Sequence, residues 1–156
     1  MRPLAVALVA KRNKPLLVYA LDDEGEPDAQ QLTKLHFTVF AALDLVEEKL
    51  QTPPVLNYLG LLGLSGTHAT YALITGATCI KVFAVFNADG EPAPKDDDVR
   101  HMLTGVHAAY VDWACNPFVK LDRRGAAVVD DPVPLLDSGP GAAVLKRRLS
   151  ELMRNF

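Results

Sequence analysis

The chain has 156 residues, enough for one domain that buries a sizeable hydrophobic core without disulfides or a structural metal, and we expect a single domain over residues 1–156. Its net charge of −3 argues against a general nucleic-acid-binding protein, which would carry a basic surplus on one face. Two cysteines, Cys79 and Cys115, do not make a zinc-binding motif, and we expect both thiols to be reduced and buried.

Two short apolar runs open the chain, residues 4–10 and 16–21, and the basic segment 11–15 separates them by the length of a hairpin connection. We expect two paired strands here. The first run is too short to cross a bilayer, and a natural partner strand follows it, so we do not interpret it as a signal segment. We therefore expect the protein to stay in the cytosol.

An amphipathic helix is predicted over residues 32–51, after an acidic loop at 22–30 and before the Pro53-Pro54 pair. Its apolar residues recur at intervals of three and four, as on one face of a helix. We expect this face, the inner stripe, to pack on a sheet, and a carboxylate in place of Leu43 to unfold the domain. The inner stripe consists of Leu35, Val39, Ala42, Leu43, Val46 and Leu50.

Three further strands are expected at residues 55–64, 68–75 and 78–86. The first of them is apolar on both sides, which is typical of a strand covered on two faces. Residues 65–67 form its turn, and the Gly76-Ala77 pair suits a tight hairpin that requires a positive φ.

A second amphipathic helix is predicted from about Val99, with Asp96 or Asp97 as its N-cap. Pro117 disfavours the helical conformation at Asn116, so the helix ends there, with Asn116 available to cap the last carbonyls and Phe118 turned onto a defined surface.

An irregular segment at about 119–141 follows, and a short helix over residues 142–153 closes the chain. Leu145, Leu149 and Leu152 share one side of this helix, and the basic residues 146–148 face water.

No arrangement in the sequence indicates catalysis. The glycines at positions 60, 63 and 66 lie within a strand and its turn instead of between a strand and a helix, so they do not form a phosphate cradle. We expect no catalytic residue, no cofactor and no metal ligand. The alternative is a small enzyme with a cysteine nucleophile, which rapid alkylation of a cysteine with loss of an activity would indicate. The histidines are spread over different elements: His36, His68, His101 and His107.

The back of the first predicted helix is the candidate binding surface. Phe37, Ala41, Asp44 and Glu48 recur at spacings of four, three and four opposite the inner stripe, and Phe40 and Leu45 flank them. Large apolar side chains beside a carboxylate are unusual on a free surface, so we interpret these six residues as partner-binding. The alternative is that Phe37 is tucked under the acidic loop and Asp44 merely faces solvent.

The order of elements and several segments resemble the sedlin family of trafficking protein particle (TRAPP) subunits. The resemblance covers about residues 4–118. It departs from the family pattern at Val119, where the family has Tyr, and before the last helix, where a Ser-x-x-Phe-Asp motif is missing. The similar segments are residues 34–39, 43–49 and 58–62, Thr75 with Lys81 and Phe83, and Asn116-Pro117-Phe118.

This resemblance implies a longin-like (profilin-like) α+β fold, with a five-stranded antiparallel sheet, one helix on one face and two on the other. It further implies a non-catalytic adaptor subunit of a vesicle tether that acts as a Rab nucleotide exchange factor in ER-to-Golgi and intra-Golgi transport. The partners would be other TRAPP subunits and, indirectly, a Rab GTPase, with peripheral Golgi membrane association only through the complex. Asp44 falls at a matching family position. The alternative is a longin-type regulator that binds a SNARE motif or a GTPase directly.

Overall fold

A computed structural model of the chain describes residues 1–21, 29–50, 57–76, 79–90, 92–117, 136, 139 and 141–156. The helices and strands follow in the order that the sequence predicts. They are β1 (Arg2–Val9), the short 3-10 helix η1 (Lys11–Asn13), β2 (Pro15–Ala20), α1 (Ala29–Leu50), β3 (Tyr58–Ser65), β4 (His68–Ile74), β5 (Lys81–Asn87), α2 (Asp96–Ala114) and α4 (Ala142–Arg154).

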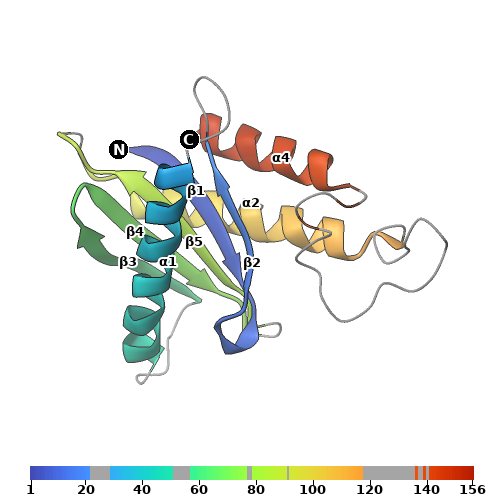
Figure 1. Ribbon diagram of the computed structural model, residues 1–156, viewed down its shortest axis with the longest axis horizontal. Coiled ribbons are helices and arrows are strands. Elements are labelled where there is room, and N and C mark those ends of the chain that lie inside the picture. The colour runs from blue at the N-terminus through green and yellow to red at the C-terminus, as the bar shows by residue number, and fades with distance from the viewer. Residues whose placement is uncertain are drawn as a thin grey trace.

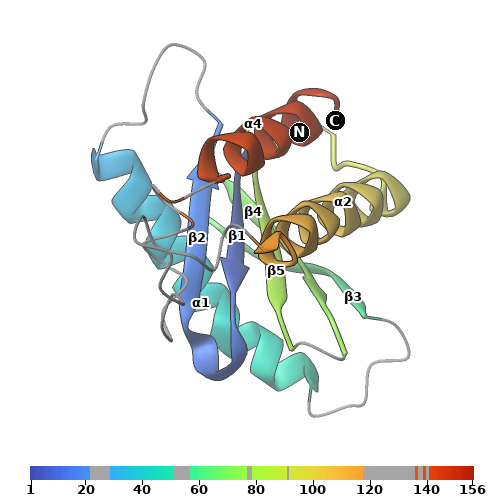
Figure 2. The ribbon, with the colours of Figure 1, turned by 90° about the vertical axis from the view of Figure 1, so that its right-hand side faces the viewer.

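The strands form one five-stranded sheet in the order β2-β1-β5-β4-β3, with antiparallel pairing throughout. Helix α1 covers one face of this sheet, and α2 and α4 lie together over the other (Figures 1 and 2). This is the predicted longin-like α+β arrangement. It places β1 and β5 at the centre and leaves β2 and β3 as the edge strands.

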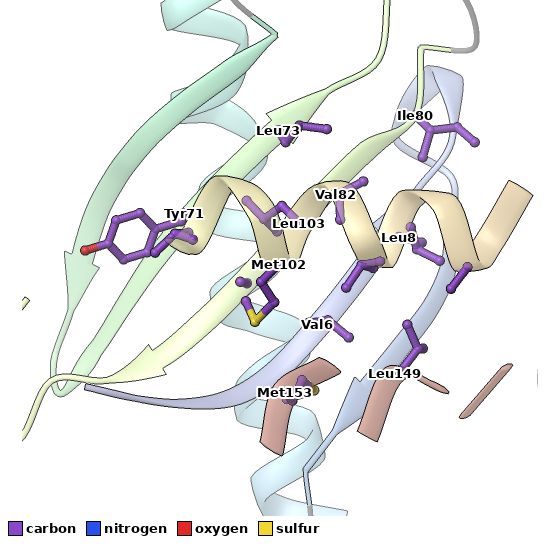
Figure 3. Packing of buried hydrophobic residues seen from close by; sticks show 14 of the residues in the cluster. Val6, Leu8, Tyr71, Leu73, Ile80, Val82, Met102, Leu103, Leu149 and Met153 are labelled. Atoms are coloured by element: carbon purple, nitrogen blue, oxygen red, sulfur yellow. The ribbon is translucent and has the colours of Figure 1, made fainter. Parts of the chain in front are cut away.

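Two hydrophobic clusters hold the layers together, one on each face of the sheet. Side chains of β5 alternate between them: Phe83 and Val85 pack towards α1, whereas Val82 packs towards α2. Figure 3 shows α2 crossing the strands on this second face, with Met102 and Leu103 directed at the sheet and Met153 of α4 nearby. Burial on both faces explains why β5 is apolar almost without interruption.

Strand β3 is less covered than its sequence suggests, and the prediction of a strand buried on two faces is wrong. It lies at the edge of the sheet, and Leu61 and Leu64 remain 42% and 66% exposed. Two irregularities interrupt its pairing with β4, between Tyr58 and Gly60 and between Leu61 and Gly63. An apolar run alone does not distinguish an edge strand from a central one.

The connection between β4 and β5 also differs from the prediction. The Thr75 N–H donates to the Ile80 carbonyl and the Cys79 N–H to the Thr75 carbonyl, so this is a longer loop, with β5 starting at Lys81. The positive φ, 52°, occurs at Cys79 and not at Gly76. Ala77 lies outside the described residues.

Helix α2 begins earlier than predicted, and Lys95 occupies its N-cap position without a side-chain cap. Asp96 and Asp97 therefore lie in the first turn, where their charges favour the positive end of the helix dipole. At the other end, the Asn116 N–H donates to the Trp113 carbonyl, and the helix stops before Pro117 as predicted. Phe118 lies outside the described residues, as does the predicted helix stop at Pro53-Pro54.

Most of the predicted irregular segment and the acidic loop likewise lie outside the described residues. Within the former, Leu136 is fully buried in the cluster beneath α2 and α4. Helix α4 buries Leu145 and Leu149 as predicted, and Leu152 packs on α2 beside Gly105.

Candidate protein-interaction surface

Helix α1 packs on the core with one face and exposes the opposite face to solvent. The inner stripe is buried, with Leu35 1% and Val46 0% exposed, and only Leu50 at the last position is partly accessible. All six predicted binding residues lie on the outside of the helix. Phe37, Phe40, Ala41, Asp44, Leu45 and Glu48 are exposed, and together they are called the outer α1 surface below.

Polar contacts on both flanks fix the rotation of α1 about its axis. On the β2 side, the Asn13 amide donates to Glu47 Oε1 at 2.8 Å, and Lys81 donates to the same asparagine. On the β3 side, Lys49 Nζ donates to the carbonyl oxygens of Leu59 and Leu61 at 3.0 and 2.8 Å. Because both flanks are fastened to the sheet, the outer α1 surface is held facing away from it.

The apolar part of this surface is unusually large for an exposed helix. Phe37 is 72% exposed, Phe40 42% and Leu45 37%. Phe40 stacks on His36 with ring centroids 6.5 Å apart, and Leu45 lies over β3, where a Cβ at Gly63 would be only 3.1 Å from Leu45 Cδ1. Exposed aromatic side chains of this size at the centre of a rigid face are typical of protein contact sites.

Two carboxylates complete the surface. Asp44 and Glu48 are both exposed, and neither forms an ion pair or a hydrogen bond with another described residue. They stand one helical turn apart, in line with Phe37 and Ala41. The outer α1 surface therefore offers an apolar patch with two carboxylates at one end. A partner segment that carries apolar and basic side chains would complement it.

The structure does not bring the other candidate residues together into a reactive site. No three His, Cys, Asp or Glu side chains of the described residues are grouped closely enough to hold a metal ion. His107 Nε2 is buried with no hydrogen-bond partner among the described residues, while His36 belongs to the aromatic stack on α1. No helix in the described part of the chain has both the length and the apolar character needed to span a bilayer.

Both cysteines are free, but the prediction that they are buried is wrong, because Cys79 and Cys115 are exposed. Cys79 lies in the loop before β5, and Cys115 follows the last turn of α2. Successive helical residues are about 100° apart, so Cys115 points nearly opposite to Trp113, which is buried.

A tyrosine that sequence reasoning did not single out links β3 to the start of α2. The Tyr58 hydroxyl donates to Asp96 Oδ1 at 3.0 Å. Burial, with this hydrogen bond as the second cause, raises the pKa of Tyr58 far above its ordinary value, and burial also raises the pKa of Tyr71 beside it. Spacing alone gave no signal for this contact, because the two residues are 38 positions apart.

Comparison with known proteins identifies the family. The family model described as Sedlin matches residues 8–129, a range that includes the whole outer α1 surface and ends before α4. The chain belongs to the Sedlin family. This confirms the resemblance seen in the sequence.

Individual relatives of this Sedlin-family chain carry the name trafficking protein particle complex subunit 2-like protein. Those from Taeniopygia guttata and Xenopus tropicalis are 31% and 32% identical to it over 121 residues, which cover 74% of this chain and 81% of each relative. The relative from Dictyostelium discoideum is 27% identical over 124 residues, 78% of this chain and 85% of the relative.

Proposed function

We propose that this protein is a non-catalytic subunit of a trafficking protein particle and that it binds a neighbouring subunit through the outer α1 surface. Family membership and the names of the relatives support the assembly. One observation carries the assignment of the surface: Phe37 is 72% exposed on a helix whose opposite face is fully used by the core. Leaving a large aromatic side chain in water loses the stabilisation that burial in a contact would provide.

The same proposal gives the protein its cellular setting. As an adaptor in a vesicle tether that activates a Rab GTPase, it acts in transport between the ER and the Golgi and within the Golgi. It contacts the GTPase only indirectly and reaches membranes peripherally, as part of the assembled particle.

The structure favours side-chain docking on α1 over strand addition at β3. The carbonyls of Leu59 and Leu61 accept hydrogen bonds from Lys49, and the strand is irregular at two places. Carbonyls already bonded to a lysine of α1 and irregularities along an edge strand hinder pairing with another chain. A partner therefore gains more from the preformed apolar and acidic face of α1.

Affinity purification tests this proposal. The tagged chain, expressed in cells that lack the endogenous protein, is expected to co-purify with particle subunits identified by mass spectrometry. Phe37→Ala and Asp44→Asn are expected to reduce that recovery, whereas Val144→Ala, at a 60% exposed apolar position on α4, leaves it unchanged. Equal recovery by all variants would refute the assigned surface, and recovery of no particle subunit would refute the assembly.

The same purified protein distinguishes the alternative mechanism. Tight binding of an isolated SNARE helix or of a GTPase to the chain alone, without other subunits, would show a direct regulator instead of an adaptor.

A further inference from the structure

A cavity of about 520 Å³ lies far from the outer α1 surface, on the face of the sheet that carries α2 and α4. It forms where β1 begins, β2 has ended, α2 begins and α4 ends, so segments from four parts of the sequence meet there. Figure 2 shows the two ends of the described chain close together at this place, between α4 and the start of α2. Its volume falls within the range of pockets that bind small ligands.

The walls of the cavity are in part apolar, and prolines stiffen them. Pro3, Pro92 and Pro94 line it, and each has a ring that fixes its backbone φ. The Met1 amine donates to the Pro92 carbonyl at 3.1 Å, which ties the start of β1 to the segment before α2. The Phe156 ring packs on Phe86 of the core, with centroids 5.0 Å apart. A cavity preformed in this way requires little ordering when a ligand enters.

The rim is cationic, although the protein as a whole is acidic. Among the described residues that line the cavity, Arg2, Lys95 and Arg154 carry the cationic side chains and Asp98 the acidic one. Lys95 precedes α2 and Arg154 ends α4, so these two cations come from different walls. Neither of them forms an ion pair with another described residue. In a chain of net charge −3, basic side chains thus outnumber acidic ones among the described residues that line this cavity.

We infer that this cavity binds an acidic peptide segment that carries one apolar side chain. The carboxylates would be held between Lys95 and Arg154, and the apolar side chain would enter among the prolines and Phe156. Guanidinium and ammonium groups that converge from two walls suit carboxylate recognition, because charge-assisted hydrogen bonds are the strong ones. The inference does not depend on the proposed function, since the cavity and α1 lie on different faces of the sheet.

The shape of the site favours a peptide over a lipid surface. Its apolar groups line a hollow, whereas insertion into a bilayer requires apolar side chains that project beyond the basic ones. Arg147, an exposed cation about two turns before Arg154 on α4, is 3.8 Å from Glu151, which reduces the charge available to a flat anionic surface.

Titration of the full chain with short synthetic peptides, followed by backbone amide NMR, tests the inference. Peptides that each carry two carboxylates and one leucine or phenylalanine, at different spacings, are expected to shift the amides of Ala93, Lys95 and Arg154. Counterparts with Asn and Gln in place of the acids are expected to shift none of them. Lys95→Glu and Arg154→Glu should each weaken binding about tenfold, and raised salt should weaken binding to the parent chain.

The controls separate this site from general charge effects. Arg147→Glu makes the same charge change on α4 outside the cavity and should leave peptide binding unchanged, as should Phe37→Ala. Arg154→Lys should recover most of the affinity. The inference is overturned if no acidic peptide shifts the cavity amides, if the neutral peptides shift them equally, or if Arg147→Glu weakens binding as much as Arg154→Glu. Binding of phosphatidylserine vesicles through Lys95 and Arg154 without peptide binding would overturn it in favour of a membrane site.

Discussion

Replacing one residue on each face of α1 separates a core position from an interface position. Leu43 is 4% exposed, so Leu43→Ala removes buried methyl groups and leaves a cavity, which costs about 2–5 kcal/mol of unfolding free energy. For a domain of this size, that loss lowers Tm by about 5–15 °C. Phe37 is 72% exposed, and Ala is the better helix former, so Phe37→Ala should change stability by about 0.5 kcal/mol or less.

Partner binding should be weakened more by Phe37→Ala than by Leu43→Ala, the reverse of their effects on stability. Truncating an aromatic residue at the centre of an interface typically costs about 2 kcal/mol or more, which corresponds to a loss of affinity of at least about thirtyfold. Urea titration can be followed by the fluorescence of Trp113, the single tryptophan, which lies in the last turn of α2 and is buried. Comparable destabilisation by Phe37→Ala and Leu43→Ala would refute the reasoning, because it would place Phe37 in the core.

Three other perturbations test the packing. A Cβ at Gly105 would lie 3.0 Å from Leu152 Cδ2, so Gly105→Ala should gain its full helix-forming advantage of about 1 kcal/mol only when Leu152→Ala is also present. Thermal unfolding of the parent, the two single variants and the double variant measures this coupling. Equal gains in stability with Leu152 and with Ala at position 152 would contradict the contact. Tyr58 has a raised pKa in the folded protein, so folding favours its neutral form; this stabilisation is complete below the ordinary pKa of 10.0 and is lost as pH rises beyond it. Unfolding free energy should therefore fall less steeply above about pH 10 in Tyr58→Phe than in the parent, and identical slopes in urea titrations would oppose the assigned hydrogen bond to Asp96. Lys49→Met removes the donors that cover the β3 carbonyls, and sedimentation velocity should detect self-association that Lys49→Arg does not show; a monomeric Lys49→Met protein would mean that this edge is protected by other means.

The sequence predicted α1 well because an amphipathic helix carries its own phase. Apolar residues at intervals of three and four place Leu35 and Val46 inward and, by the same geometry, Phe37 and Asp44 outward. Both faces are found as predicted. The exposure of Phe37 supports the proposal that the outward face binds a partner.

Features that depend on contacts between distant segments could not be predicted in this way. The apolar run of β3 gave no sign that the strand would lie at an edge, because edge and centre are decided by the pairing of the whole sheet. Cys79 was expected in a strand and instead lies in the loop before β5, where its φ is positive. The cationic cavity joins Arg2, Lys95 and Arg154, which no local pattern connects.

A photo-crosslinking amino acid in place of Phe37 tests the central claim most directly, with Val144 on α4 as the matched exposed position. After irradiation of the assembled complex in cells, the probe at position 37 should yield one discrete adduct with a subunit of the trafficking protein particle, and the probe at position 144 should not yield that adduct. Absence of an adduct from position 37 in complexes that still assemble, or the same adduct from both positions, would contradict the account.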